Sequence, residues 1–152
     1  MSAIDVVSDA NVALKWFHAE GEEEVHEARA LLDAHRSREL GVVVLDLTPY
    51  EVGNALMRGR ARATAEQAAI VLDSLGQVCG TVSPDAADFR RAAELAEQHG
   101  LSLYDAAYAA VAEGHGADLA TLDRELLNAD LGVRPGDLAR KYGREIEGGD
   151  DG

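Results

Sequence analysis

The chain has 152 residues, of which 47% are hydrophobic and 28% are charged, and its formal net charge is −14 at pH 7. This length and apolar content fit one globular domain with a packed core and exclude a largely disordered chain. The longest apolar run, residues 106–112, is too short to span a membrane, and Asp5 and Asp9 interrupt any amino-terminal signal. The single cysteine, Cys79, excludes an internal disulfide, so we expect a soluble, cytoplasmic chain.

The negative charge disfavours nucleic acid as a ligand, because phosphates attract cations. However, the excess of negative charge is uneven, because residues 20–27 contain five acids and the carboxy-terminal tail contains four, whereas "MRGRAR" at 57–62 is basic. Net charge governs solubility and long-range steering, and a binding site is governed by its local charges. The acidity therefore argues against binding of nucleic acid without excluding it.

Strand and helix signals alternate along the chain. "GVVVLDL" at 41–47 is a β-branched run between Gly41 and Pro49, which is typical of a buried strand. Thr64 and Gln67 match a capping box, and Gly100 ends a helix. In chain order we expect a strand at 3–8, helices at 11–17 and 22–38, a strand at 41–47, helices from 48 and from 64, a weak strand at 78–82, helices at 85–99 and from 102, a strand at 117–122, a helix at 123–129 and a last helical turn at 134–142. The alternation predicts an α/β fold with a parallel sheet covered on both faces.

Acidic residues fall at the junctions between these expected strands and helices. Asp9 follows the first strand, and Asp123 ends the strand at 117–122. Glu51 in "TPYE" and Asp105 in "SLYD" lie in the first turns of helices. In such sheets ligands bind beyond the carboxyl ends of the strands, where the following helices begin. We therefore expect these four acids to face one cleft.

Each acid alone also has a simple structural explanation as a helix cap or as a partner of a helix dipole, worth about 0.3 to 1 kcal/mol. Four converging carboxylates are different, because two negative charges about 4 Å apart repel by about 4 kcal/mol at an effective dielectric near 20. Such a group must bind protons or cations, and hard oxygen ligands suit Mg²⁺ or Mn²⁺. A divalent cation held in this way can activate water and neutralise charge on a phosphoryl group, so phosphodiester hydrolysis is the expected chemistry.

The blocks "VVSDANVALKWF", "LTPYEVGNAL", "GLSLYDAAYAAVA" and "LATLDREL" occur in this order between about residues 4 and 130. In order and spacing they resemble the four acidic blocks of the PIN-domain ribonucleases, most closely the VapC toxins of bacterial and archaeal VapBC toxin–antitoxin pairs. The resemblance implies a PIN-like fold, a small parallel sheet of about four to five strands with helices on both faces. We expect this domain at residues 1–142, followed by a disordered acidic tail at 143–152.

The resemblance also implies a Mg²⁺- or Mn²⁺-dependent endoribonuclease with one or two ions, which leaves 5′-phosphate and 3′-hydroxyl ends. Asn11 and Thr121 match positions where small polar residues line the family's site. Further implications are an RNA substrate, a cognate VapB-type antitoxin that blocks the site, a homodimer and a toxin–antitoxin hetero-oligomer. A catalytically silent PIN-like binding module, regulated by a partner protein, is the alternative. The family's metal-binding acids correspond to Asp9, Glu51, Asp105 and Asp123.

Basic and aromatic residues near these blocks each have two interpretations. Arg58 lies two helical turns beyond Glu51 and can share its face, which would direct Arg58 toward the RNA strand. Arg60 and Arg62 follow in an expected loop, where they can bind phosphate or form a solvated turn. The adjacent aromatics at 16 and 17 can contribute to a groove for the antitoxin or divide between core and surface.

Two other functional classes have less support in the sequence. A metal-free ribonuclease would use paired histidines as acid and base, and the five histidines of this chain are scattered along it. A Mg²⁺-binding receiver-like signalling domain would need an early acidic pair and a phosphate-accepting aspartate at the end of a central strand. Asp46 is the only nearby candidate for the acceptor, and no such pair precedes it.

Overall fold

The computed structural model describes residues 3–19 and 23–147, and its side chains as far as residue 142. The described strands are β1 (Val6–Ser8), β2 (Val42–Leu45), β3 (Gly80–Val82) and β4 (Asp118–Ala120). The helices are α1 (Ala10–Ala13), the 3₁₀ helix η1 (Leu14–Trp16), α2 (Val25–Arg36), α3 (Thr48–Arg58), α4 (Ala65–Val78), α5 (Ala86–His99), α6 (Leu103–His115), α7 (Arg124–Asn128) and α8 (Pro135–Glu147). The expected order of elements is confirmed, and the strands are shorter than expected.

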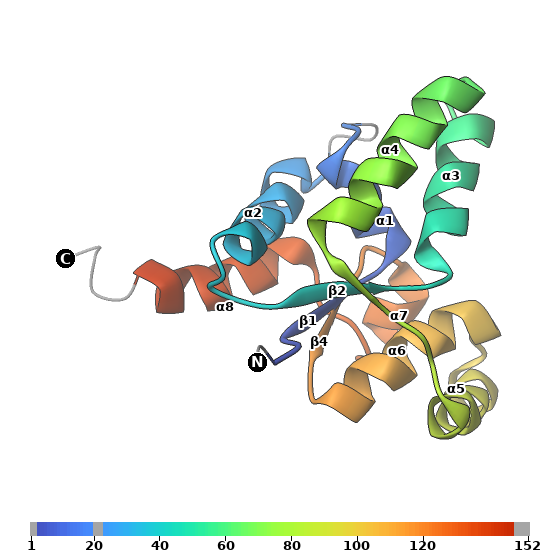
Figure 1. The fold of residues 1–152 in the computed structure, drawn as a ribbon. Coiled ribbons are helices and arrows are strands. Elements are labelled where there is room, and N and C mark those ends of the chain that lie inside the picture. The colour runs from blue at the N-terminus through green and yellow to red at the C-terminus, as the bar shows by residue number, and fades with distance from the viewer. Residues whose placement is uncertain (1–2, 20–22, 148–152) are drawn as a thin grey trace.

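The four strands form one parallel sheet in the order β3-β2-β1-β4. The chain moves outward from the central strand β1 to β2 and β3, and then crosses to the other side of β1 to form β4. In Figure 1 the carboxyl ends of the strands point toward α1 and the start of α3. The predicted α/β fold with a small parallel sheet is thus confirmed, and the change of direction beside β1 is where such sheets bind ligands.

Helices cover both faces of the sheet, with α1, α2, α3 and α4 on one side and α5, α6 and α7 on the other (Figure 1). Successive strand residues point to opposite faces, so Val6 joins the first core cluster and Val7 the second. Val44 and Leu45 of β2 divide in the same way. This two-sided burial explains why β2 is a continuous apolar run.

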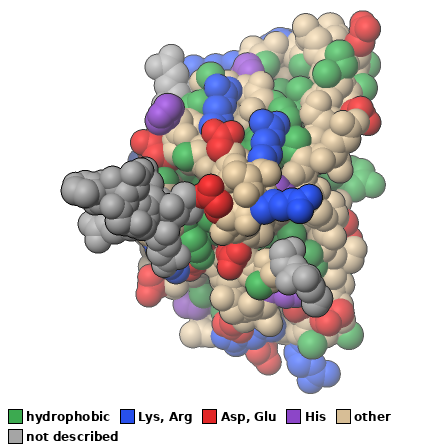
Figure 2. Space-filling model, turned by 60° about the vertical axis from the view of Figure 1, so that its left-hand side comes forward, with side chains coloured by type: hydrophobic (Ala, Val, Ile, Leu, Met, Phe, Trp, Pro, Cys, Tyr) green, Lys and Arg blue, Asp and Glu red, His purple; other side chains and the backbone are tan. Residues whose placement is uncertain are grey.

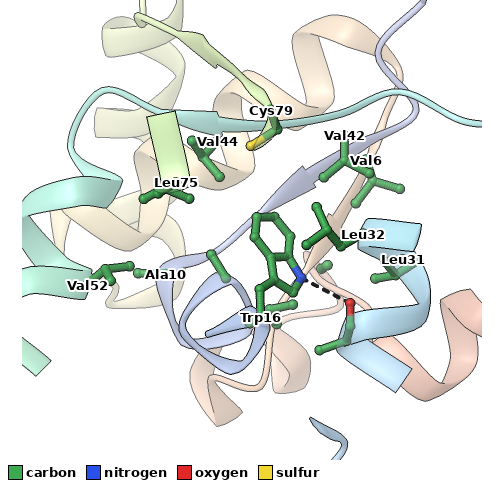
Figure 3. Close-up of a cluster of buried hydrophobic side chains, with 14 of the residues drawn as sticks. Val6, Ala10, Trp16, Leu31, Leu32, Val42, Val44, Val52, Leu75 and Cys79 are labelled. Atoms are coloured by element: carbon green, nitrogen blue, oxygen red, sulfur yellow. Dashed lines mark hydrogen bonds between the residues drawn. The ribbon is translucent and has the colours of Figure 1, made fainter. Parts of the chain in front are cut away.

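Trp16 belongs to the first core cluster, with only 7% of its surface exposed. Its indole N–H donates a 3.0 Å hydrogen bond to the carbonyl oxygen of Ala28 on α2, as Figure 3 shows. Phe17 is partly buried and packs against the same cluster. Trp16 therefore stabilises the core, and its side chain is not free to line a groove for a partner.

The last helix, α8, extends five residues beyond the expected boundary at 142 and ends at Glu147. Its start is fixed to the residues before α2, because Arg134 forms ion pairs with Glu23 and Glu24 and the Gly136 amide donates to Glu24. Leu138 is buried in the first core cluster. Residues 143–147 continue this helix, residues 148–152 lie outside the described part of the chain, and disorder of the acidic tail stays a prediction.

The face that carries α2 and α8 shows basic and acidic side chains lying among each other (Figure 2). The ion pairs of Arg134, and that of Lys141 with Asp118, belong to this region. Among residues 3–19 and 23–147, no helix combines the length and the apolar character needed to cross a membrane.

Candidate active site

The four acids line one pocket of about 250 Å³ at the carboxyl ends of the strands. Asp9 directly follows β1, and Asp123 follows β4 by three residues. Glu51 lies in the first turn of α3, just after β2. Asp105 lies in the first turn of α6. The lining residues are Asp9, Ala10, Asn11, Leu14, Glu51, Ala55, Asp105 and Asp123.

Asp9 is the most deeply buried of these acids, with 5% of its surface exposed. One carboxylate oxygen accepts a 2.7 Å hydrogen bond from the Ala10 amide at the start of α1, as a helix cap does. The other accepts from the Thr121 hydroxyl at 2.7 Å and from the Asn11 amide at 3.4 Å. Capping thus uses only one oxygen of Asp9, and the second oxygen belongs to a network of side chains from both ends of the chain.

Thr121 and Asn11 link the end of β4 to the start of α1. Thr121 is fully buried, and its hydroxyl also accepts a hydrogen bond from the Asp123 amide at 3.0 Å. The Asn11 side-chain oxygen accepts from the Leu122 amide at 3.2 Å. Both residues therefore hold the segment that carries Asp123 beside Asp9, which is a positioning task for the two polar residues singled out in the sequence.

A buried hydrogen-bond chain fixes Glu51. The Tyr108 hydroxyl donates to a carboxylate oxygen of Glu51 at 2.8 Å and lies 2.7 Å from the Thr48 hydroxyl, which accepts from the Leu45 amide. Because Tyr108 donates to Glu51, Thr48 donates to Tyr108. Thr48 therefore does not cap α3, and "TPYE" does not form a helix cap. Tyr108 lies within the apolar run at 106–112, where only its hydroxyl distinguishes it from a core residue.

Asp105 and Asp123 meet a further acid, Glu125, in the first turn of α7. Carboxylate oxygens of these three residues lie within 4.8 Å of one another. Oxygen ligands of Mg²⁺ lie about 2.0–2.1 Å from the ion, so opposite ligands of an octahedron are about 4.1 Å apart. The three oxygens therefore fit one hard cation after small adjustments. Asp9 and Glu51 line the same pocket but stand outside this tight group.

Glu125 had not been singled out in the sequence. Its amide donates to a carboxylate oxygen of Asp123 at 2.8 Å, so Asp123 does cap α7, as its position suggested. Glu125 follows Asp123 by two residues within one helical turn, and this spacing is the sequence signal for Glu125. Asp105 is different, since the Ser102 hydroxyl accepts from the Asp105 amide while the Asp105 carboxylate lies beside Asp123.

The pocket holds its acids in an environment that disfavours their charged forms. Burial raises the pKa of Asp9 from 3.8 to about 7, and the nearby charges of Glu51 and Asp105 act in the same direction. Burial likewise raises the pKa of Glu51, with a further contribution from Asp105. The pKa of Asp105 is raised by burial and then by the charge of Asp123. A positive ion in the pocket would offset all three effects.

The three arginines near α3 do not line this pocket. Arg58 ends α3 one turn beyond Ala55, and its side chain is exposed, as are those of Arg60 and Arg62 in the following turn. Asp46 is also exposed and does not line the pocket. The receiver-like interpretation, which needs Asp46 in an acidic site, is therefore wrong.

A larger cavity of about 730 Å³ lies at the opposite ends of the strands. Asp5 and Gly41, which precede β1 and β2, line it together with basic residues such as Arg36 and Arg38. Its size does not make it the better candidate for the active site, because the converging acids lie at the other edge of the sheet.

Comparison with known proteins decides the family. The model of the PIN domain matches residues 6–131, which is most of the chain. This chain belongs to the PIN-domain family. The matched region contains all four pocket acids and ends just before the segment that leads into α8.

Two relatives of this PIN domain come from Pyrobaculum aerophilum. Ribonuclease VapC3 is 40% identical over 86 residues, which are 54% of this chain and 66% of that protein. Exonuclease VapC9 is 37% identical over 100 residues, which are 65% of this chain and 72% of that protein. The match to VapC3 thus spans just under two thirds of its length.

Solved structures show the same PIN fold. The crystal structure of the Pyrobaculum aerophilum protein PAE2754 is similar with a TM-score of 0.68 and 26% identity, over 92% of this chain and 90% of that chain. VapC20 of Mycobacterium tuberculosis, a toxin that cleaves the sarcin–ricin loop, has a TM-score of 0.63 and 18% identity, over 82% and 95% of the two chains. The second likeness concerns the fold alone.

Replacing Gly132 of the PIN domain with alanine is expected to lower the free energy of unfolding. The added Cβ would lie 2.4 Å from the Thr121 methyl group. Thr121 cannot rotate away without losing its bonds to Asp9 and Asp123, so we expect a cost of about 1–3 kcal/mol in urea unfolding. Gly76→Ala is the control, because nothing lies within 4 Å of its added Cβ and alanine favours the interior of α4. A Gly132→Ala protein as stable as the wild type would contradict this account of the Thr121 network.

Tyr108→Phe is expected to lower the free energy of unfolding by about 1–3 kcal/mol, because it leaves the buried Thr48 hydroxyl without its acceptor. It should also weaken binding of Mn²⁺ at pH 6 more than at pH 8, since the hydrogen bond from Tyr108 lowers the pKa of Glu51. Calorimetric titration at the two pH values measures this difference. Tyr50→Phe, which removes an exposed hydroxyl, is the control and should change neither quantity. Equal loss of affinity at both pH values would contradict the role given to Tyr108.

Proposed function

We propose that this chain is a Mg²⁺- or Mn²⁺-dependent endoribonuclease of the VapC type, the toxin of a type II toxin–antitoxin pair. The observation that carries the proposal is the convergence of Asp9, Glu51, Asp105 and Asp123 on one pocket at the carboxyl ends of the sheet. The names of the relatives, a ribonuclease and an exonuclease, support nuclease chemistry. The proposal goes further than these names in one respect, namely that the enzyme cuts RNA internally.

The residues of the pocket have distinct tasks in this proposal. Asp105 and Asp123, with Glu125 beside them, would hold the ion, and Asp9 and Glu51 would complete the acidic wall on the opposite side. When bound, the ion supplies positive charge that polarises the phosphate and activates water. Thr121 and Asn11 position Asp9 and the Asp123 segment, and Tyr108 positions Glu51. The exposed arginines at 58, 60 and 62 would contact the RNA backbone away from the cut.

A circular RNA tests both whether cleavage depends on the metal ion and whether the cut is internal. The purified chain should open a circular RNA in Mn²⁺ or Mg²⁺, and EDTA should abolish the reaction. An exonuclease leaves a circle intact because it needs an end. Metal binding without cleavage of any RNA, in protein free of bound partner, would favour the silent binding module. Cleavage that survives EDTA would overturn the metal-dependent mechanism.

The partners in this proposal are inferred from structures with the same fold. Solved structures with the same fold include a toxin–antitoxin complex from Klebsiella pneumoniae and VapBC2 from Rickettsia felis bound to promoter DNA. By analogy we propose a cognate antitoxin that covers the acidic pocket, and a homodimer. Expression of the wild-type chain in a bacterial host should then arrest growth, and co-expression of the antitoxin should restore it. Growth unaffected by active enzyme would argue against the toxin role.

A further inference from the structure

A second pocket, of about 480 Å³, adjoins the acidic one. Glu51 lines both pockets, so the two share a wall. The size lies within the range of about 300–1,000 Å³ that is usual for small-molecule sites. The lining residues are Leu47, Tyr50, Glu51, Asn54 and Tyr104.

Two exposed tyrosines distinguish this second pocket. The exposed fraction is 78% for Tyr50 and 66% for Tyr104, although the chain has only four tyrosines. The other two have structural contacts, since Tyr108 is fully buried and Tyr142 bonds to Asp118. Exposed aromatic rings that line a pocket beside a catalytic site are candidates for contact with a ligand.

The position of each tyrosine follows from the acid beside it. Tyr50 directly precedes Glu51 in α3, and Tyr104 directly precedes Asp105 in α6. Adjacent residues of a helix point about 100° apart, so an acid that faces the pocket leaves its neighbour facing the rim. The two helices begin on neighbouring sides of the acidic pocket, and their tyrosines therefore reach the same second pocket. Asn54 lies one turn beyond Tyr50 on the same side of α3.

We propose that Tyr50 and Tyr104 bind an unpaired nucleobase of the RNA beside the phosphate that is cut, with the Asn54 amide facing the edge of the base. The proposal rests on the nuclease function above and specifies its substrate as a single-stranded segment or loop. Bases stack on aromatic rings whatever their sequence, and a base within a duplex is not accessible to them.

The charge of the protein makes such a contact valuable. With a net charge of −14, the chain gains little from general attraction to phosphates. Stacking on an uncharged ring provides affinity that this charge does not oppose, and it places the neighbouring phosphate at the wall formed by Glu51. A protein partner or a second copy of the chain is the competing occupant of the tyrosine pocket, and the continuity with the acidic pocket favours RNA.

Binding is measured first, because it does not depend on catalysis. The probe is a fluorescent 12-nucleotide single-stranded RNA, titrated with Asp9→Asn protein in Mg²⁺. Adding Tyr50→Ala or Tyr104→Ala should weaken binding about tenfold each, whereas Tyr50→Trp should preserve it. Phe89→Ala on α5 is the control, because Phe89 is half exposed and lines neither pocket. Equal affinity of the tyrosine variants and the control would overturn the proposal, even if the wild type proves to be a nuclease.

Cleavage then locates the base. A substrate with one abasic nucleotide next to the cut should be processed about tenfold more slowly by the wild type, with the loss mainly in KM. In Tyr50→Ala/Tyr104→Ala the same abasic nucleotide should cost almost nothing, because the contact is already missing. A full abasic penalty in the double variant would overturn the proposal. A changed oligomeric state in sedimentation, together with that full penalty, would assign the pocket to a contact between copies.

Discussion

Asp9→Asn is expected to abolish RNA cleavage while it raises the melting temperature of the metal-free protein. The carboxylate of Asp9 belongs to the acidic wall of the pocket, and loss of its charge should reduce kcat/KM by at least about 1,000-fold, or about 4 kcal/mol. The same charge is unfavourable in the folded chain without a cation, because Asp9 is buried near Glu51 and Asp105. Asparagine keeps the shape, and its oxygen can still accept from the Ala10 amide, while its NH2 group would donate to the Thr121 hydroxyl instead of accepting from it. We therefore expect the metal-free variant to melt about 5 °C higher at pH 7.5.

The control for this experiment is Asp46→Asn. Asp46 also follows a central strand, but it is exposed and does not line the pocket. This change should leave both cleavage and melting temperature within experimental error of the wild type. An Asp9→Asn protein that is both inactive and less stable would show that Asp9 serves the fold first. That outcome would contradict the prediction, which requires that the Asp9 carboxylate supports cleavage and destabilises the metal-free protein.

The second large effect is a loss of stability of the metal-free protein as the pH rises. An unfolded Asp9 releases its proton near pH 3.8, and the folded chain holds it until about pH 7. Between these values the folded state binds the extra proton, so stability is fully present below pH 3.8 and is lost as the pH rises through 7. The shift of about three pKa units corresponds to about 4 kcal/mol. The raised pKa values of Glu51 and Asp105 act in the same direction.

Urea unfolding in EDTA at pH 5, 6, 7 and 8 measures this dependence. The wild type should lose stability over the series, and Asp9→Asn should lose less, since the difference between them isolates the contribution of Asp9. Saturating Mg²⁺ should restore stability at pH 8 more than at pH 5, because the ion binds only the deprotonated carboxylates. If the stability of the two proteins depends on pH in the same way, burial does not raise the pKa of Asp9, and the prediction is contradicted.

The order of elements and the edge of the sheet that carries the acids follow from the sequence by general rules. Buried parallel strands are apolar throughout, as at Val42–Leu45, and their carboxyl ends meet at one edge. The four acids were predictable because each stands at such an end or at the start of a helix beside it. The sequence does not show whether Trp16 lies in the core or at the surface, because two adjacent aromatic residues cannot both face the same side. The packing of η1 against α2 places Trp16 in the core.

Side-chain contacts between distant segments were not predictable. Thr48 matches a cap in sequence, yet the proximity of Tyr108 from another helix gives it a different partner. The spacing of Asp123 and Glu125 places these two acids together, but it does not show that Asp105 at the start of α6 lies beside them. Helix α8 continues to Glu147, past the expected helical turn at 134–142, and its contact with α2 cannot be read from the polar residues after 142.

Crystals grown with Mn²⁺ test the central claim most directly, because anomalous scattering locates the ion independently of activity. The account predicts a strong anomalous peak between the carboxylates of Asp105 and Asp123, in the pocket that Asp9 and Glu51 also line. The peak should disappear when the ion is removed with EDTA. Full occupancy of Mn²⁺ elsewhere on the molecule, with the four carboxylates bonded only to protein groups and protons, would contradict it.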